Sequence, residues 1–374
     1  MSSAGSIVVV AGFLVALANG ANDVSKGIAT LVGSGVSDYR RAIRWGALCT
    51  ALGGLTGGSL AWAMVSTFGN GLLAPGTPPT FAAALATILG ATAWVLIATR
   101  SGLPVSTTHA IVGAIAGVGA VAYGFHGINW VAIGGKVVLP LLLSPVVSLV
   151  VTLLLLRVAS VATSPAAEPA DCLCTEIEPS LVPVGASNTA ALVAQGLQAR
   201  ITIGTQVACA TERPTALRLT VDHVHWLTSG ATSFARGMND APKIVALMLA
   251  ASALSGGSPV APSLMFVLAT LGMVAGSLVG GRRVTNVLAE KVTRLDHRGG
   301  FVANLVTAAV VTAGAVGGLP MSTTHVSSGA IIAAGAERGA INWRTVHGMV
   351  LAWVVTVPAA AALGVAVFAV VGTR

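Results

Sequence analysis

Charged residues are scarce in this sequence. Only 9% of its 374 residues are Asp, Glu, Lys or Arg, and 55% are hydrophobic, whereas roughly 25% of a soluble domain is charged. This shortage excludes an ordinary soluble domain. Apolar runs of about 20 residues, long enough to cross a bilayer as a helix, recur along the chain, and the 45 glycines suit helices that pack closely in lipid. We therefore expect an all-α integral membrane protein.

Other features are missing as well. The four cysteines suggest no disulfide framework. Residues 5–18 resemble the core of a signal peptide but lack a preceding basic segment, so we expect them to stay in the mature protein. Cys172-Leu-Cys174 and His223-Val-His225 match no standard zinc spacing, so no metal is expected. No other cofactor is expected either.

The formal net charge is +8, which could indicate binding to nucleic acid. The basic residues, however, lie in short loops between apolar runs. This pattern indicates orientation in a membrane instead. We therefore expect a multi-pass protein of the cell membrane with no nucleic-acid partner.

Two polar motifs each occur twice, in the same order. Asn-Asp-x-x-Lys stands at residues 22–26 and again at 239–243, and Pro-x-Ser-Thr-Thr-His stands at 104–109 and again at 320–325. Paired polar interruptions in otherwise apolar helices are typical of a transporter site at the interface between two repeats.

The repeated motifs divide the chain into three segments. We expect a first inverted membrane repeat at 1–157, a cytoplasmic linker or small module at 158–222, and a second inverted repeat at 223–374. In the first repeat we expect helices at about 5–33, broken near 19–23, and at about 45–66, 80–101, 108–122 and 128–156. In the second we expect them at about 224–252, 262–280, 299–317, 324–336 and 343–371.

Equivalent loops of the two repeats carry opposite charge patterns. The loop at 40–44 is basic and its counterpart at 255–262 is uncharged, whereas the loop at 69–79 is uncharged and its counterpart at 282–298 is rich in Arg and Lys. Because basic loops stay in the cytoplasm, the repeats are predicted to lie upside down relative to each other. Each Pro-x-Ser-Thr-Thr segment then forms the tip of a re-entrant hairpin. Both termini lie outside, and residues 157–222 lie in the cytoplasm.

The central segment breaks the apolar pattern. Residues 164–186 contain four prolines and four acidic residues, which is typical of a linker. Short β-like runs follow at 199–204 and 217–221. A small folded module is therefore a second interpretation of this segment.

The hydroxyl clusters at the two tips suit a tetrahedral oxyanion. A tip leaves backbone N–H groups unpaired, and the following helix presents its positive N-terminus to the same point. The alternative is that these hydroxyls bond back to helix carbonyls, but recurrence of the whole motif favours the anion site. The residues concerned are Ser106, Thr107, Thr108, Ser322, Thr323 and Thr324.

Each Asn-Asp motif places an acid inside an apolar helix. Asp23 and Asp240 are costly there, and intramembrane acids commonly handle ions or protons. Lys26 and Lys243 follow three residues later, on the same helix face. Each pair could neutralise itself and stiffen its helix. Alternatively, the lysines attract an anion while the aspartates handle the coupling ion, and both roles are compatible.

Two arginines and two histidines lie close to these motifs. Arg100 and Arg236 have no charged counterpart in the other repeat, so each could lend charge to an anion or extend to the membrane surface. His109 and His325 directly follow the hydroxyl clusters. We expect them to cap or pack the helix rather than to transfer protons.

At these motifs the chain resembles the inorganic phosphate transporter (Pit) family of secondary symporters. The resemblance covers both membrane halves and rests on Gly-x-Asn-Asp at 20–23 and 237–240, and on Leu-Pro-x-Ser-Thr-Thr-His at 103–109 and 319–325. It implies an inverted-repeat transporter with two re-entrant hairpins, usually a homodimer, that moves phosphate with Na⁺ or H⁺. By the same resemblance, the hydroxyl clusters grip phosphate, and the ion and anion site is lined by Asn22, Asp23, Asn239 and Asp240.

The sequence departs from the family pattern at the two lysines. Sodium-coupled members typically have an asparagine where Lys26 and Lys243 stand. An ammonium beside each aspartate takes the electrostatic role of a bound cation, so we expect import of phosphate by alternating access with H⁺ rather than Na⁺. Sulfate or another oxyanion on the same fold, or a passive anion channel, are the alternatives. An enzyme is not expected, because the adjacent hydroxyls and histidines lack an evident third partner.

Overall fold

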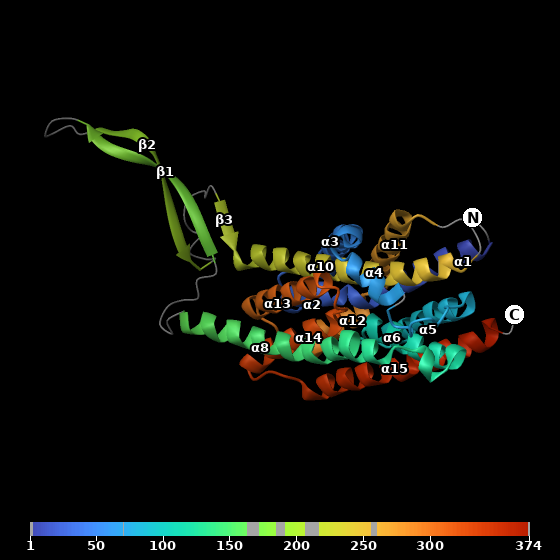
Figure 1. Cartoon of the computed structure of the whole chain (residues 1–374). Helices are drawn as coiled ribbons and strands as arrows, with labels where there is room; N and C mark the ends of the chain where they lie inside the picture. The colour runs from blue at the N-terminus through green and yellow to red at the C-terminus, as the bar shows by residue number, and fades with distance from the viewer. Residues whose placement is uncertain are drawn as a thin grey trace. The chain divides into compact units, whose positions relative to one another are not determined.

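The computed structural model describes residues 3–69, 71–162, 172–184, 191–205, 217–255 and 260–372. The chain forms two compact units, one of Met1–Leu156 with Leu227–Arg374 and the other of Arg157–Trp226. The first unit is helical, and the second contains a small β-sheet (Figure 1).

The helices of the first half follow one another with short connections. They are α1 (Ser3–Asp23), α2 (Ser25–Gly33), α3 (Tyr39–Leu60), α4 (Trp62–Gly69), α5 (Phe81–Arg100), α6 (Thr107–Tyr123), α7 (Trp130–Ala132) and α8 (Leu139–Ala162). A 3₁₀ turn, η1 (Phe125–Gly127), and a π-helical segment, η2 (Ile133–Val138), lie between α6 and α8.

The second half repeats much of this order. Its helices are α10 (Val221–Ala253), α11 (Pro262–Gly280), α12 (Arg282–Asn286), α13 (His297–Val316), α14 (Thr323–Glu337) and α15 (Trp343–Val371), with a π-helical segment η3 (Val287–Lys291) after α12. Most expected helix ranges agree with these bounds within a few residues. Side-chain caps explain several helix starts, because Thr80 and Asp296 accept bonds from the backbone N–H groups of Ala83 and Gly299.

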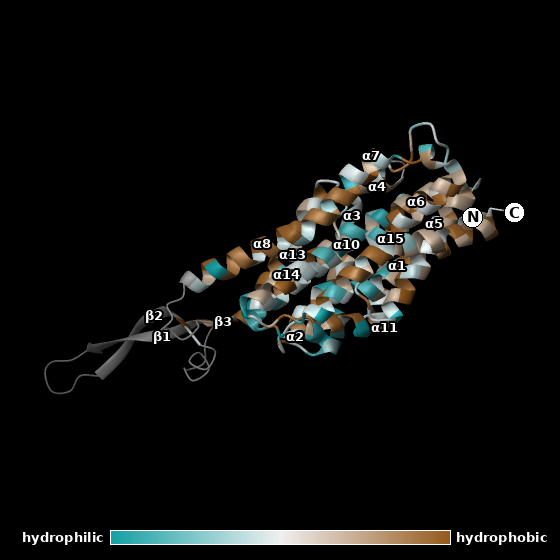
Figure 2. Ribbon diagram, turned by 90° about the horizontal axis from the view of Figure 1, so that it is seen from below, coloured by the Kyte–Doolittle hydropathy of each residue, from teal (hydrophilic) through white to brown (hydrophobic). Residues whose placement is uncertain are grey.

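Six helical segments of the described residues are long and apolar enough to cross a bilayer, and α3 with α4, bent by 76°, form a seventh if that pair is one span. Figure 2 shows hydrophobic residues along most of the length of helices such as α8. The 33-residue α10 is also long enough, but it carries Arg236, Asp240 and Lys243 in its middle. The protein is therefore a multi-pass membrane protein. The six segments are Ser3–Gly33, Phe81–Arg100, Trp130–Ser160, Pro262–Gly280, His297–Val316 and Trp343–Val371.

Glycines allow α1 and α11 to pack backbone to backbone. A Cβ atom added at Gly20 would overlap the carbonyl of Met273, and one added at Gly276 would overlap the carbonyl of Leu17. Such close approach is how small residues hold helices together in lipid. It brings the first Asn-Asp motif, which begins two residues after Gly20, against the second half of the chain.

The expected helix breaks at the Asn-Asp motifs need correction. In the first half, α1 ends at Asp23 and α2 begins at Ser25, but Val24 between them keeps right-handed helical angles. In the second half, α10 continues unbroken through Asn239 and Asp240 despite Pro242. The acids do not need an opened backbone, because side chains from neighbouring elements satisfy them.

The expectation of an all-α protein also needs correction. Strands β1 (Cys172–Val184), β2 (Ala191–Gly204) and β3 (Leu217–Thr220) form an antiparallel sheet in the order β2-β1-β3. Thus much of the expected linker is a strand, and the β-like runs extend further than the sequence indicated.

The prolines of β1 are compatible with this strand for a geometric reason. In the described part of the chain, β3 pairs only with Cys172–Thr175 of β1. Pro179 and Pro183 lie beyond that range and are paired with β2 alone. Within the described part of this unit, one edge of β1 is therefore unpaired there, and proline is tolerated at such edges. The other two prolines of the expected linker, at 165 and 169, lie outside the described residues.

Candidate functional site

The two Pro-x-Ser-Thr-Thr segments form matching turns between helices. A glycine with positive φ stands two residues after the end of α5 and of α13, with φ 72° at Gly102 and 70° at Gly318. The residue after this glycine forms a backbone hydrogen bond back to the helix. In the first turn the N–H of Leu103 donates to the carbonyl oxygen of Ala98, and the second turn has the equivalent bond. This helix ending favours glycine, because other residues are strained at positive φ.

Each turn then leads into a helix that begins at its serine. The side chain of Ser106 accepts a bond from the backbone N–H of His109 at 3.3 Å, and that of Ser322 accepts one from His325 at 3.2 Å. Both serines act as helix caps. The following threonines thus lie in the first turns of α6 and α14, where the helix N-termini favour negative charge.

Each Asn-Asp motif holds the turn of its own half. The side chain of Asn22 donates to the carbonyl of Leu103 at 3.0 Å and accepts from the N–H of Val105 at 3.2 Å. In the second half, Asn239 donates to the carbonyl of Met321 at 3.0 Å. The paired motifs of the sequence are therefore structural partners.

Further bonds join the two halves. The hydroxyl of Thr324 donates to the carbonyl of Val105 at 2.7 Å, and Lys243 donates to the hydroxyl of Thr108 at 2.8 Å. The two turns thus meet in one cluster. Thr323, beside Thr324, is also buried.

The two carboxylates share one asparagine. Asn19 Nδ2 lies 2.9 Å from Asp23 Oδ2, 3.1 Å from Asp240 Oδ2 and 3.1 Å from Thr107 Oγ1. An amide nitrogen has two hydrogens to donate, so these three acceptors compete for them. Acids that are 217 residues apart in sequence therefore lie at one point.

Both lysines are buried and fully engaged with protein atoms. Lys26 Nζ lies 2.6 Å from Asp23 Oδ1 and also donates to both oxygens of Asn22. Lys243 Nζ lies 3.0 Å from Asp240 Oδ1, and it donates to Thr108 and to a backbone carbonyl. An ammonium has three N–H donors, so each lysine uses all of them. This is the geometry of the self-neutralising pair.

Arg236 differs from the lysines in its partners. Its side chain is fully buried, and Nη2 donates to Thr50 at 2.6 Å and to Ser277 at 3.3 Å. Its Nε and Nη1 atoms are buried and have no hydrogen-bond partner among the residues that the structure describes. Arg236 occupies the position equivalent to Asn19 in the other repeat. It is thus a buried cation with donors available to a bound anion.

Arg100 lies apart from this cluster. Its side chain is exposed at the end of α5, and its backbone carbonyl accepts a bond from Arg283 Nη1. The structure therefore brings together the other predicted site residues but leaves Arg100 at the surface.

The two histidines pack against each other beside the cluster. The ring centroids of His109 and His325 are 4.6 Å apart, and that of His325 lies 4.1 Å from the ring of Trp353. Trp353 Nε1 in turn donates to the carbonyl of Pro104 in the first turn. These contacts match a packing role that holds the first turn in place.

Sequence reasoning missed several partners in the cluster. Asn19 joins the two carboxylates, and the only signal for it was an amide one helical turn before Asp23. Thr50, Thr99 and Ser277 bind Arg236 or Asn22. Hydroxyls in apolar helices commonly bond to their own backbone, so the sequence did not distinguish these three.

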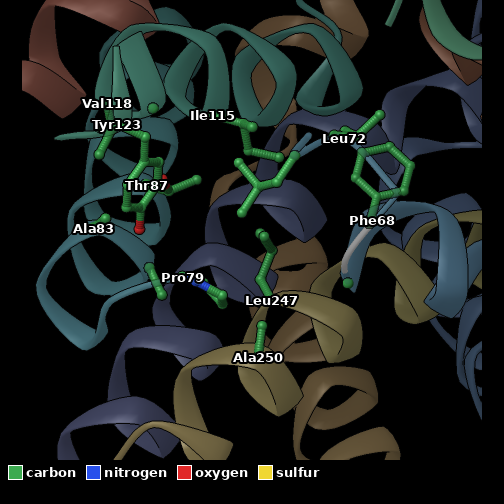
Figure 3. A pocket seen from close by; sticks show the side chains of 14 residues that line it. Phe68, Leu72, Pro79, Ala83, Thr87, Ile115, Val118, Tyr123, Leu247 and Ala250 are labelled. Carbon is green, nitrogen blue, oxygen red and sulfur yellow. The ribbon is translucent and has the colours of Figure 1, made fainter. Parts of the chain in front are cut away.

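Two other regions do not suit an anion or a metal. The pocket in Figure 3 has a cavity of about 60 Å³, and no charged side chain lines it. Cys172 and Cys174 lie with their sulfur atoms 3.7 Å apart, and His223 contacts the hydroxyl of Thr220. Within the described ranges, no three His, Cys, Asp or Glu residues are grouped as they would be around a metal ion.

Comparison with known proteins agrees with this architecture. The chain is 30% identical over 394 residues to a protein of Pyrococcus furiosus that bears the name of a phosphate permease, which covers 97% of this chain and 95% of that one. It is 28% identical to the chloroplastic inorganic phosphate transporter 2-1 of Arabidopsis thaliana, over 95% of this chain and 70% of the relative. A solved structure titled as the sodium-dependent phosphate transporter matches with a TM-score of 0.79 at 23% identity, over the full length of both chains.

The solved structure shows the shared fold, and the family follows from the sequence. The profile described as the phosphate transporter family matches residues 19–364. This range includes both Asn-Asp motifs and both Ser-Thr-Thr turns. The chain therefore belongs to the phosphate transporter family.

Proposed function

We propose that this protein imports inorganic phosphate across the cell membrane by alternating access, and that it binds the anion where the two Ser-Thr-Thr turns meet. The observation that carries this proposal is the joining of both turns and both Asn-Asp motifs in one buried cluster. The family and the names of the relatives support phosphate as the cargo.

The formal charges of the cluster favour an anion. Asp23 and Asp240 offset Lys26 and Lys243, which leaves the charge of Arg236 in excess. An unpaired buried charge costs several kcal/mol. A bound anion would remove this cost, and a planar guanidinium can bind two phosphate oxygens at once. We therefore assign Arg236 as the main charged partner of phosphate.

Burial of the cluster supports alternating access. Asp23, Asp240 and the threonines of both turns are nearly inaccessible to solvent. An anion can reach them only after some of the elements that cover the cluster move. A passive channel would instead need a continuous open path.

The lysines support coupling to protons. Each ammonium already lies against an aspartate oxygen, at 2.6 Å and 3.0 Å. A sodium ion at the same oxygen would meet a like charge, and two unit charges 4 Å apart repel by about 4 kcal/mol at an effective dielectric of 20. The single excess positive charge is balanced by H₂PO₄⁻, which is equivalent to HPO₄²⁻ carried with one proton.

Phosphate is favoured over sulfate by the acids of the cluster. Phosphate can donate a proton in a hydrogen bond to Asp23 or Asp240, whereas sulfate offers no proton at neutral pH. Sulfate and related oxyanions are the second candidates, because they match the hydroxyls and Arg236 in shape and charge.

Uptake into proteoliposomes tests cargo and coupling together. Labelled phosphate should enter faster at lower external pH, and replacement of Na⁺ by K⁺ or choline at constant pH should change little. Labelled sulfate in the same vesicles distinguishes the cargo, and accumulation against a gradient excludes a channel. A requirement for a sodium gradient at constant pH would contradict the role given to the lysines.

The variant Lys26→Asn with Lys243→Asn sharpens this test. It removes both ammonium groups while keeping the aspartates, so we expect uptake by this variant to become stimulated by sodium. The single variant Arg344→Gln changes an exposed cation far from the motifs in sequence and serves as the control. Sodium-independent uptake by a folded Asn double variant would show that the lysines do not set the coupling ion.

A further inference from the structure

A second basic site lies between the end of α5 and the junction of α11 with α12. It is a cavity of about 650 Å³, lined by Arg100, Arg282, Arg283 and Asn286 together with apolar residues of α1, α5 and α11. These residues are separate from the buried cluster. All three arginine side chains are exposed.

The arginines are held in place without acidic partners. Arg283 Nη1 bonds the carbonyl of Arg100 across the end of α5, and the Arg282 guanidinium lies 5.9 Å from the centre of the Tyr39 ring. Neither Asp nor Glu forms an ion pair with any of the three within the part of the chain that the structure describes. Three arginines therefore line one cavity, and among the described residues none of them is in an ion pair.

Apart from Thr99, the remaining residues that line the cavity are apolar or glycine. Leu96 and Val279 line it, and the Val279 side chain is 85% exposed on α11, a helix long and apolar enough to span a bilayer. The site thus combines a cationic end with a side that faces hydrocarbon when α11 lies in a membrane. Basic pockets between membrane helices suit the head groups of anionic lipids.

We propose that this pocket binds a phosphate group, carried by an anionic phospholipid or present as free phosphate. The arginine forks provide the donors that phosphate oxygens accept in pairs. The apolar wall provides a surface for an acyl chain. The proposal does not depend on the anion assigned to the buried cluster.

The pocket is also close to the cluster. Thr99 lines the pocket, and its hydroxyl accepts a bond from Asn22 of the first Asn-Asp motif at 3.0 Å. An occupant of the pocket would therefore lie one side chain away from the residue that holds the first turn.

Two binding measurements on the full chain test the proposal and identify the source of the phosphate group. In the first, detergent-purified protein is incubated with phosphatidylglycerol or phosphatidylcholine, and retained lipid is counted by native mass spectrometry. In the second, delipidated protein is titrated with labelled inorganic phosphate by equilibrium dialysis. The pocket variant is Arg282→Gln with Arg283→Gln, and the matched control, Arg157→Gln with Arg344→Gln, removes the same charge at exposed positions elsewhere.

A lipid occupant predicts that the pocket variant loses phosphatidylglycerol binding by at least about tenfold, a change of 1.4 kcal/mol, while the control retains it. If the occupant is free phosphate, the wild type and the control should each bind one more phosphate per chain than the pocket variant does. Equal behaviour of all three proteins in both measurements, or equal losses in pocket variant and control, would overturn the proposal. Arg100→Gln provides a second variant that keeps the carbonyl bonded by Arg283, and thermal melting checks that each variant folds.

Discussion

At the scale of single residues, the site is a balance of buried charges. Each aspartate is neutralised by the lysine three positions later. All three N–H donors of each lysine form hydrogen bonds to protein oxygens. Arg236 is the buried cation that keeps unpartnered N–H groups among the described residues of this cluster. The lysines thus set the local charge, and Arg236 is available to the anion.

Replacing Arg236 should separate these roles. A charge-assisted hydrogen bond contributes roughly 1.5–3 kcal/mol, so Arg236→Gln should weaken phosphate binding by about tenfold or more. Arg236→Lys keeps the charge but loses the planar fork, and should lie between Gln and wild type. Equilibrium dialysis measures the affinity, and melting temperature shows whether the loss of the Thr50 and Ser277 bonds unfolds the protein. Wild-type affinity in a folded Arg236→Gln variant would remove the arginine from the site.

The hydroxyls of the turns have an observed capping role and a proposed role in binding phosphate, and the two can be measured separately. Replacing Ser106 and Thr107, or Ser322 and Thr323, by alanine should weaken phosphate binding by more than about a hundredfold, since each lost bond to a charged group costs roughly 1.5–3 kcal/mol. The serine in each pair is also a helix cap, so each variant should lose about 1 kcal/mol of stability. The single variants Ser106→Ala and Ser322→Ala control for that loss. Near-normal phosphate affinity in both double variants would place the anion elsewhere.

At the scale of elements, the turn between α5 and α6 lies against the turn between α13 and α14. The direction of each turn is fixed by a glycine with positive φ and by an asparagine of the matching Asn-Asp motif. The turn and the motif are therefore one unit, although they are about 80 residues apart.

Gly102→Ala tests whether the direction of the turn matters for transport. A non-glycine residue at positive φ is strained by roughly 1–2 kcal/mol, while an added Cβ atom would meet its nearest atom, the carbonyl oxygen of Arg283, at an ordinary 3.7 Å. Gly76→Ala is the matched control, because Gly76 has φ +83° and no atom within 4 Å of an added Cβ. Both variants should lose similar stability, but only Gly102→Ala should slow phosphate uptake. Equal uptake by the two variants would mean that the geometry of the turn is not limiting.

At the scale of the whole molecule, the helical unit has a defined polarity. The start of α1 and the end of α15 lie at the same end of it (Figure 1). This arrangement agrees with termini on one side of the membrane. Their placement outside, the placement of residues 157–222 in the cytoplasm and the homodimer implied by the family stay predictions.

Cysteine labelling tests the predicted topology. In a variant without the native cysteines, Glu290→Cys and Gly76→Cys place thiols at two exposed positions, one in the basic segment 282–298 and one in the uncharged loop 69–79. A membrane-impermeant reagent added outside intact cells should modify position 76 and leave position 290 unmodified until the membrane is permeabilised. Modification of position 290 but not position 76 from outside would contradict the inverted arrangement.

Local features of the sequence account for much of this fold. Apolar runs indicate which segments are membrane helices, and capping residues such as Thr80 and Asp296 indicate where helices begin. Both signals are local, because they depend only on residues within the helix or next to its start. The duplicated motifs also indicated the family and most residues of the cluster. The strand β1 was missed because its prolines resemble a linker until its pairing with β2 is known.

The tertiary structure alone decided how the side chains meet. Asn19 bridges Asp23 and Asp240 because close packing brings together helices that are over 200 residues apart, and no local pattern encodes that distance. The same packing left α10 unbroken, buried Arg236 beside the acids and placed Arg100 in a separate pocket with Arg282 and Arg283. Two arginines that each stand within a few residues of a motif in the sequence thus have different surroundings, because the packing of neighbouring helices determines which charge is enclosed.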